Sequence, residues 1–259
     1  MKVLVLRMYK GIMVPIWKCL AGVSQRLAAV IHKQLMRAEW CVDTPEFFNH
    51  DIDLYYQWRK EGRAYWLERG IYNILALQMF EKPIVVELCC GEGFNTKYFY
   101  SKIADKIWAC DFDREAIKGA KKKYSMNNIE FAIADIREEI PVTLGGEKIT
   151  NIIWDAAIEH FTPEEIHAIM SKLKERLEER VGILSGYTIV ERCEGKSLEQ
   201  HEYEFKNKED LERFLTPYFK NVMVFETIYD NRHNLYFWAS DGDIPFSTNW
   251  KHGTYCGCK

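Results

Sequence analysis

The sequence lacks the features that would place it in a membrane-spanning, fibrous or disordered class. Its 259 residues contain no uninterrupted apolar run of the roughly 20 residues that cross a bilayer. Internal repeats and low-complexity linkers are also absent. Charged residues make up 28% of the chain and the net charge is -3, which is typical of a soluble globular protein. This balance gives no indication of binding to a polyanion, and we expect no nucleic-acid partner.

The chain has eight cysteines but no disulfide pattern. Cys89 and Cys90 are adjacent at a predicted buried strand, and Cys110 lies in another. Reduced thiols in a cytoplasmic protein are therefore the simplest interpretation. A zinc site needs four ligands, and no second pair stands near Cys256 and Cys258. We predict no metal ligands there.

Acidic residues are absent from Met1 to Ala38, although this stretch holds seven lysines and arginines. Val23, Leu27 and Val30 fall at helical spacing, which predicts an amphipathic helix. One interpretation is peripheral contact of residues 1–37 with an anionic surface on the inner membrane face. The alternative is packing of the helix on the protein's own core or on a second subunit, and the sequence leaves the oligomeric state open.

Eight aromatic residues lie between Phe47 and Tyr72, and several can share one side of a helix. Packing is one interpretation, and a lid over a cleft is the other. After residue 84 the pattern changes to short apolar runs separated by polar helical stretches. We predict an N-terminal helical extension or lid over 1–80, a ligand-binding domain over 81–242 and a tail over 243–259.

Strands and helices alternate in that domain, which predicts an α/β fold with a parallel sheet and right-handed crossovers. The last two strands have no helix between them, and a turn containing Arg232 and His233 joins them as an antiparallel hairpin. The expected strands are Ile84–Leu88, Lys106–Asp111, Ile129–Ala134, Asn151–Asp155, Val181–Tyr187, Val222–Thr227 and Leu235–Ala239. The expected helices are Asn95–Ile103, Arg114–Tyr124, Pro163–Arg180 and Lys208–Leu215. Thr162 is the expected N-cap of the third helix, with Glu165 three residues after it.

A glycine turn follows the first strand in V-V-E-L-C-C-G-E-G-F-N-T, Val85 to Thr96. The dinucleotide fingerprint G-x-G-x-x-G is incomplete, because Gly91 and Gly93 are followed by Thr96 instead of a third glycine. The phosphate-binding pattern G-x-x-x-x-G-K-[ST] is absent. The turn therefore binds a nucleotide-like ligand of another kind.

Three acids stand in or after successive strands: Glu87, Asp111 and Asp135. In an open parallel sheet, ligands bind outside the carboxyl ends of the strands, so these acids face one crevice. Three acceptors suit a ligand with an amino group, a ribose diol and an adenine amine, whereas a pyrophosphate would be repelled.

Four segments resemble the successive motifs of class I S-adenosylmethionine-dependent methyltransferases. The resemblance covers about residues 84 to 240 and implies a Rossmann-like, doubly wound, mostly parallel seven-stranded sheet with a C-terminal antiparallel hairpin. An N-terminal helical extension precedes it. The segments are Val85–Gly93, Ala109–Asp113, Phe131–Ile136 and Ile153–Phe161.

The resemblance also implies the cofactor-binding residues. Gly91 and Gly93 would let the backbone approach the methionine moiety, with Glu87 holding its amino-acid end. At the second strand, Asp111 would accept from the ribose hydroxyls and Phe112 would pack on adenine.

The implied adenine site continues at the third strand. Asp135 would accept a hydrogen bond from the adenine amine, and the backbone of Ile136 would lie beside it. Acids that end strands can also serve only as helix caps, but three in register favour the binding role.

Methyl transfer to a hydroxyl group needs a base or a metal ion to activate the oxygen. Asp155, Glu159 and His160 cluster after the fourth strand, and His160 is the predicted base because histidine titrates near neutrality. His201 is the reserve base. The Glu-His-Phe stretch is similar to Glu-His-Val in ubiquinone-type O-methyltransferases, where a divalent cation has a role, but Ala156 replaces a further acid of that motif. A cation therefore stays an alternative.

The sequence thus predicts a methyltransferase that acts on a hydroxyl of a small molecule, with a sugar, glycan or lipid-linked acceptor as the first choice. The motif of amino-group methyltransferases acting on adenine or glutamine is absent. The alternatives are an N-methyltransferase of a small amine, an NAD(P)-dependent oxidoreductase, and a non-catalytic protein that binds the cofactor or docks on a membrane.

Overall fold

The computed structural model describes residues 65–140, 148–191, 199–229 and 232–247, together with helical residues between Met13 and Ile31. The chain divides into two compact units, Met1–Gly62 and Arg63–Lys259, and each is considered by itself. The aromatic residues from Phe47 to Trp58, and both cysteines of the tail, lie outside the described residues. The three predicted domain ranges stay predictions.

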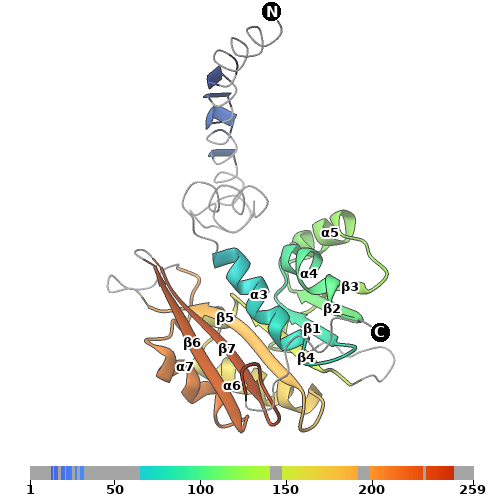
Figure 1. Ribbon diagram of the computed structural model, residues 1–259, viewed down its shortest axis with the longest axis vertical. Helices are drawn as coiled ribbons and strands as arrows, with labels where there is room; N and C mark the ends of the chain where they lie inside the picture. Colours follow the sequence, from blue (N-terminus) through green and yellow to red (C-terminus); the bar gives the residue numbers. More distant parts are fainter. Residues whose placement is uncertain are drawn as a thin grey trace, which may run out of the picture. The chain divides into compact units, whose positions relative to one another are not determined.

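The second unit is built on a seven-stranded sheet with the order β3-β2-β1-β4-β5-β7-β6 (Figure 1). The first five strands pair in parallel, and β7 is antiparallel to both β5 and β6. This arrangement confirms the predicted fold class. The strands are β1 Ile84–Leu88, β2 Lys106–Asp111, β3 Ile129–Ile133, β4 Asn151–Asp155, β5 Ile183–Ile189, β6 Asn221–Tyr229 and β7 Arg232–Ser240.

Helices cover both faces of the sheet. Successive residues of the buried strands point to opposite faces, so each strand contributes to two cores. Val86 and Ile152 pack in the same core as α6 and α7, whereas Val85 and Ile153 pack in the other core with η3 and α5. The helices are α3 Tyr65–Leu77, α4 Phe94–Tyr98, η3 Tyr100–Lys102, α5 Arg114–Lys123, η4 Ile158–His160, α6 Pro163–Arg176 and α7 Lys208–Leu215.

The predicted start of α6 is confirmed. The Thr162 hydroxyl accepts from the Glu165 backbone N–H at 3.3 Å, and the Glu165 carboxylate accepts from the Thr162 N–H at 2.9 Å. The predicted end at Arg180 was wrong, since the helix stops at Arg176. Leu177 instead packs in the core and forms a β-bridge with Ile149, so the chain leaves the helix before Arg180.

Three other predicted boundaries need correction. The helix expected at Asn95–Ile103 is broken at Phe99 into α4 and η3. Strand β5 begins at Ile183, because Val181 is exposed at the surface. Arg232 and His233 belong to β7 and pair with β6, so they are strand residues and not turn residues.

Helix α3 is held on the sheet by polar contacts. Glu68 accepts from the hydroxyls of Thr227 at 2.9 Å and Tyr236 at 2.7 Å. The Trp238 indole donates to the Tyr72 carbonyl at 3.0 Å. These contacts fix the position of α3 beside β5, β6 and β7, so its other residues can take part in a site.

The described residues of the first unit are all helical. Within the parts of the chain that the structure describes, no helix is long and apolar enough to cross a membrane.

Candidate active site

The glycine turn after β1 requires both of its glycines. Gly91 and Gly93 have positive φ angles of 53° and 75°. A Cβ on Gly93 would lie 2.6 Å from the Phe131 ring, whereas a Cβ on Gly91 would meet no atom within 4 Å. Gly93 thus permits close packing of the chain, and Gly91 borders open space that a ligand can fill.

The two cysteines before Gly91 lie in this turn, just past the end of β1, and are half-buried. The sequence predicts both cysteines in a buried strand, and Cys89 instead has a positive φ of 54°. Burial raises the pKa of both thiols well above the usual value. They are therefore neutral thiols and not nucleophiles.

Glu87 is buried in β1, where the Thr96 hydroxyl donates to its carboxylate at 2.5 Å. Thr96 stands where a dinucleotide-binding fold has its third glycine. Its hydroxyl binds the Glu87 carboxylate instead. Burial raises the pKa of Glu87 to about 8, the neighbouring Asp155 adds to this rise, and Thr96 and Arg69 oppose it. The Glu87 carboxyl group is therefore protonated at neutral pH. A cation bound beside it would favour its ionised form.

Asp111, at the end of β2, joins its strand to the glycine turn. Its two carboxylate oxygens accept from the backbone N–H groups of Gly91 and Asp113, each at 2.9 Å. Burial raises the pKa of Asp111, and these hydrogen bonds counteract the rise. The predicted ribose-binding acid therefore borders the same open space as Gly91.

The other predicted adenine-site residues lie after β2 and β3. Phe112 is 61% exposed, and the Ile136 side chain is buried in the core. The Asp135 carboxylate pairs with Arg137 at 2.6 Å, which lowers the pKa of this acid. The roles assigned to these residues stay predictions.

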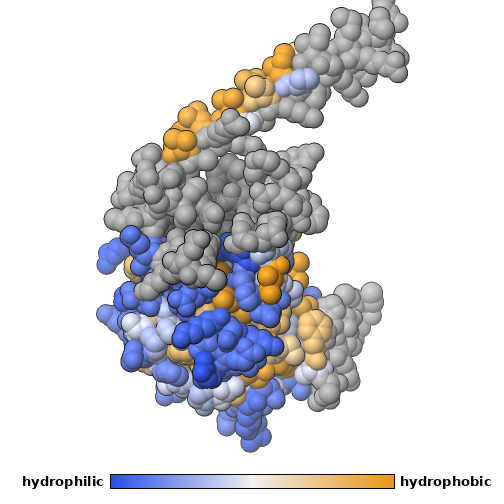
Figure 2. Space-filling model, turned by 90° about the vertical axis from the view of Figure 1, so that its left-hand side faces the viewer, coloured by the Kyte–Doolittle hydropathy of each residue, from blue (hydrophilic) through white to orange (hydrophobic). Residues whose placement is uncertain are grey.

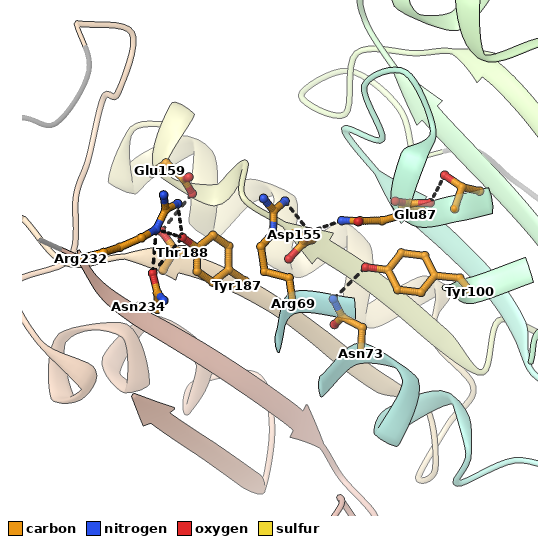
Figure 3. A network of polar contacts seen from close by, with 12 residues as sticks. Arg69, Asn73, Glu87, Tyr100, Asp155, Glu159, Tyr187, Thr188, Arg232 and Asn234 are labelled. Carbon is orange, nitrogen blue, oxygen red and sulfur yellow. Dashed lines mark hydrogen bonds and ion pairs between the residues drawn. The ribbon is translucent and has the colours of Figure 1, made fainter. Parts of the chain in front are cut away.

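A buried ion pair occupies the centre of the site. The Arg69 guanidinium of α3 donates to Asp155 Oδ2 from Nη2 at 2.6 Å and from Nε at 3.0 Å, and Asn95 donates to the same oxygen at 2.9 Å. Figure 3 shows this pair between Glu87 and Tyr187. Asp155 Oδ1 is buried and has no hydrogen-bond partner in the described structure. It is therefore an acceptor oriented for a ligand.

Glu159, His160 and His201 come together beyond this pair. Glu159 and His160 form η4 after β4, and His201 comes from the loop before α7. Their ligand-type atoms all lie within 4.8 Å of one another. The backbone N–H groups of Glu202 and Tyr203 donate to the Glu159 carbonyl at 2.9 and 3.1 Å, which ties the loop to η4.

Tyr187 and Arg232 lie beside Glu159 of this group (Figure 3). The Arg232 guanidinium donates to the Tyr187 hydroxyl at 2.6 Å, and that hydroxyl donates to the Asn234 amide oxygen at 3.1 Å (Figure 3). Arg69 lies over the Tyr187 ring, 4.8 Å from its centroid. The acceptor side of the site is therefore polar and carries two guanidinium groups.

Comparisons with known proteins agree with this geometry. Residues 85–180 match the model of the family described as "Methyltransferase domain". No curated protein matches the sequence.

Three solved structures share the fold. The DhpI-SAH complex has a TM-score of 0.54 and 17% identity, over 83% of this chain and 93% of that one. TehB from Haemophilus influenzae has a TM-score of 0.53 and 18% identity, over 72% and 65%. The N-methyltransferase NodS from Bradyrhizobium japonicum WM9 has a TM-score of 0.53 and 15% identity, over 69% and 97%.

The family match places a methyltransferase domain over residues 85–180, and the sheet with its glycine turn has the Rossmann-like fold that the sequence predicts for such a domain. Its cofactor is S-adenosylmethionine, as the sequence predicts. The residues present fit that cofactor: Gly91 borders open space, and Asp155 Oδ1 is a buried acceptor without a partner. The class does not agree with the alternative of an NAD(P)-dependent oxidoreductase.

Proposed function

We propose that the protein transfers the methyl group of S-adenosylmethionine to a hydroxyl group of a small molecule. The observation that carries the proposal is the group formed by Glu159, His160 and His201. A hydroxyl is a weak nucleophile at neutral pH, so an enzyme that methylates oxygen needs such a group, whereas an amine that is already neutral depends on it less.

In this proposal the glycine turn holds the cofactor. Gly91 and Gly93 leave room for the methionine moiety, and Glu87 with Asp155 provides carboxyl groups for its amino end. Asp111 accepts from the ribose hydroxyls.

At the adenine end, Phe112 packs on the ring, and Asp135 with the Ile136 backbone meets its polar edge. Asp135 is 2.6 Å from Arg137, so its approach to the adenine amine needs that exposed pair to open.

His160 is the histidine that an acceptor reaches first, because it is only partly buried, whereas His201 is 1% exposed. Its Nδ1 lies 3.2 Å from the Gln200 carbonyl, which accepts a hydrogen bond and leaves Nε2 with a lone pair. The acceptor oxygen gives up its proton to this group and forms a bond with the methyl carbon. The carbon–sulfur bond breaks, and its electron pair returns to sulfur.

The surroundings favour a polyhydroxylated acceptor such as a sugar, a glycan or a lipid-linked saccharide. Tyr187, Thr188 and Arg232 supply hydroxyl and guanidinium groups beside Glu159 (Figure 3). Such groups suit an acceptor with several hydrogen-bonding oxygens.

The test uses S-adenosylmethionine with a deuterated methyl group and a panel of hydroxylated and amine acceptors of similar size. Mass spectrometry identifies the labelled product, and fragmentation locates the methyl group. We expect label on oxygen of a hydroxylated acceptor. Label only on nitrogen, or cofactor binding with no product across the panel, would contradict the proposal.

A further inference from the structure

We infer that Glu159, His160 and His201 form a binding site for one divalent transition-metal ion. Among the described residues this is the one set of three side chains with converging metal-ligand atoms. The inference rests on the proposed function for the use of the ion, but the site itself is argued from the geometry of the three side chains.

Both histidines present an unprotonated nitrogen to the centre of the group. The Gln200 carbonyl accepts from His160 Nδ1–H, and the Glu204 carboxylate accepts from His201 Nδ1–H. Each contact fixes the proton on Nδ1 and leaves Nε2 as an electron-pair donor. Carboxylate and carbonyl partners on the far nitrogen are typical of histidines that ligate metals.

His201 Nε2 gives the strongest indication that this group binds a ligand. The side chain is 1% exposed, and this nitrogen has no hydrogen-bond partner in the described structure. The His160 ring lies edge-on to it, with ring centroids 4.8 Å apart. A buried nitrogen lone pair such as that of His201 Nε2 is unfavourable unless a cation or a donor lies beside it.

Glu159 completes the group with a negative charge. Its side chain is 3% exposed, and the Thr188 hydroxyl donates to Oε2 at 2.9 Å. This contact orients the carboxylate. One carboxylate and two imidazoles form the donor set of many catalytic metal sites and leave coordination positions open.

The donor set selects the kind of ion. Imidazole nitrogen suits zinc, iron, cobalt or nickel, whereas magnesium and calcium prefer all-oxygen sites. Metal–nitrogen bonds are about 2.1 Å, so two ligands of a tetrahedral ion are about 3.4 Å apart. The present separations of up to 4.8 Å would therefore close by at most about 1.4 Å on binding.

The ion changes how the group activates the acceptor. His160 Nε2 binds the ion instead of taking the proton, and the acceptor hydroxyl occupies an open coordination position. Coordination lowers the pKa of the hydroxyl, so its proton passes to solvent water and its oxygen attacks the methyl carbon. Asp155 takes no part, because Arg69 and Asn95 hold it away from the group.

The test is a titration of the full-length, chelator-treated protein with Co²⁺, whose visible absorption reports coordination by the protein. We expect saturation at one equivalent. His201→Ala and His160→Ala should bind more than about tenfold more weakly, and Glu204→Gln about 10- to 100-fold more weakly. His167→Gln changes an exposed histidine on α6 and should bind as the parent does.

Circular dichroism and S-adenosylmethionine affinity show whether each variant is folded. A folded parent that binds no Co²⁺, or a folded His201→Ala variant that binds it with parental affinity, would overturn the site. Hydroxyl methylation that is unaffected by a chelator would overturn the metal and leave the proposed function standing. Stoichiometric Co²⁺ binding without hydroxyl methylation would keep the site and contradict the proposed function.

A different observation concerns the first unit, where an apolar row lies open on the described helix. Its members are Ile16, Leu20, Val23, Leu27, Val30 and Ile31, which are 44% to 60% exposed. The intervals of four and three residues place the first five on one side of a helix (Figure 2). We propose that this row binds an anionic lipid surface.

The positive charge of this segment favours an anionic lipid surface over a second copy of the chain as the binding partner. The first 38 residues contain seven lysines and arginines and no acid. Paired helices usually place opposite charges beside their apolar seam, and two copies of this segment would bring like charges together. An anionic lipid surface supplies the complementary charge and takes up the apolar row.

The test is co-sedimentation of the full chain with vesicles of phosphatidylcholine alone or with phosphatidylserine. We expect binding to the anionic vesicles that weakens with salt and falls at least about tenfold in a Leu20→Ser, Leu27→Ser variant. Ile228→Ser, which changes a 69% exposed residue of β6, is the control and should bind as the parent does. No binding to anionic vesicles, or a dimer that this double variant dissociates, would overturn the lipid assignment.

Discussion

Arg69 and Asp155 form an ion pair whose side chains are 8% and 4% exposed, with Nη2 2.6 Å from Oδ2. The pair joins α3 to the carboxyl end of β4, where we propose that the cofactor and the acceptor meet. The pKa of Arg69 is raised overall: burial acts to lower it, and the Asp155 carboxylate more than offsets that effect. Arg69 therefore stays charged.

Removal of one partner should leave an uncompensated buried charge. Arg69→Met is expected to lower the free energy of unfolding by about 3–5 kcal/mol in urea titrations. The matched control is Arg137→Met, because Arg137 and Asp135 are also 2.6 Å apart but are 52% and 27% exposed. That change should cost less than about 1 kcal/mol. Equal losses in both variants would show that burial of the central pair does not matter.

Glu87 should make the cofactor-free protein less stable as pH rises. Its pKa is about 8 in the folded chain against an ordinary value of 4.5, so between these values the folded state holds one more proton than the unfolded state. Stability from this group is complete below the lower value and is lost as pH rises toward the upper one.

Urea unfolding at several pH values in this window, for the parent and Glu87→Gln, isolates that contribution. The difference in stability should change by about 1.4 kcal/mol per pH unit in favour of the variant. A constant difference across the window would mean that Glu87 is ionised in the folded protein.

Gly93→Ala should impair both folding and cofactor binding. Alanine at this position would have to keep a φ of 75°, and its Cβ would lie 2.6 Å from the Phe131 ring. We expect a loss of about 1–3 kcal/mol, measured by urea unfolding, and weaker S-adenosylmethionine binding by calorimetry. Gly119→Ala is the control, since its Cβ meets nothing within 4 Å in helix α5, and should be neutral or stabilising. A Gly93→Ala protein as stable as that control would refute the packing argument.

The sequence was sufficient for the succession of strands and helices along the chain and for the mostly parallel sheet, because buried apolar runs and helix caps are local signals. Thr162 and Glu165 gave the start of α6 in this way. Its end was not readable, since Leu177 leaves the helix to bridge Ile149, a residue distant in sequence. The break at Phe99 likewise had no local signal in the sequence.

The site was predictable where residues follow strands and unpredictable where they come from other elements. Glu87, Asp111 and Asp155 could be predicted to lie near one another because parallel strands end at one edge. Arg69 was missed as the partner of Asp155, since 86 residues separate them. The convergence of His201 with His160 depends on a loop whose path no motif encodes.

The central claim is that the group around His160 activates the acceptor beside the bound cofactor. The most direct measurement is the rate of label transfer from S-adenosylmethionine to the identified acceptor in His160→Ala, with cofactor affinity measured by calorimetry. We predict a rate about 10²- to 10⁴-fold below that of the parent, with unchanged cofactor affinity and with full activity in His167→Gln. A His160→Ala enzyme that transfers the methyl group at the parental rate would contradict the account.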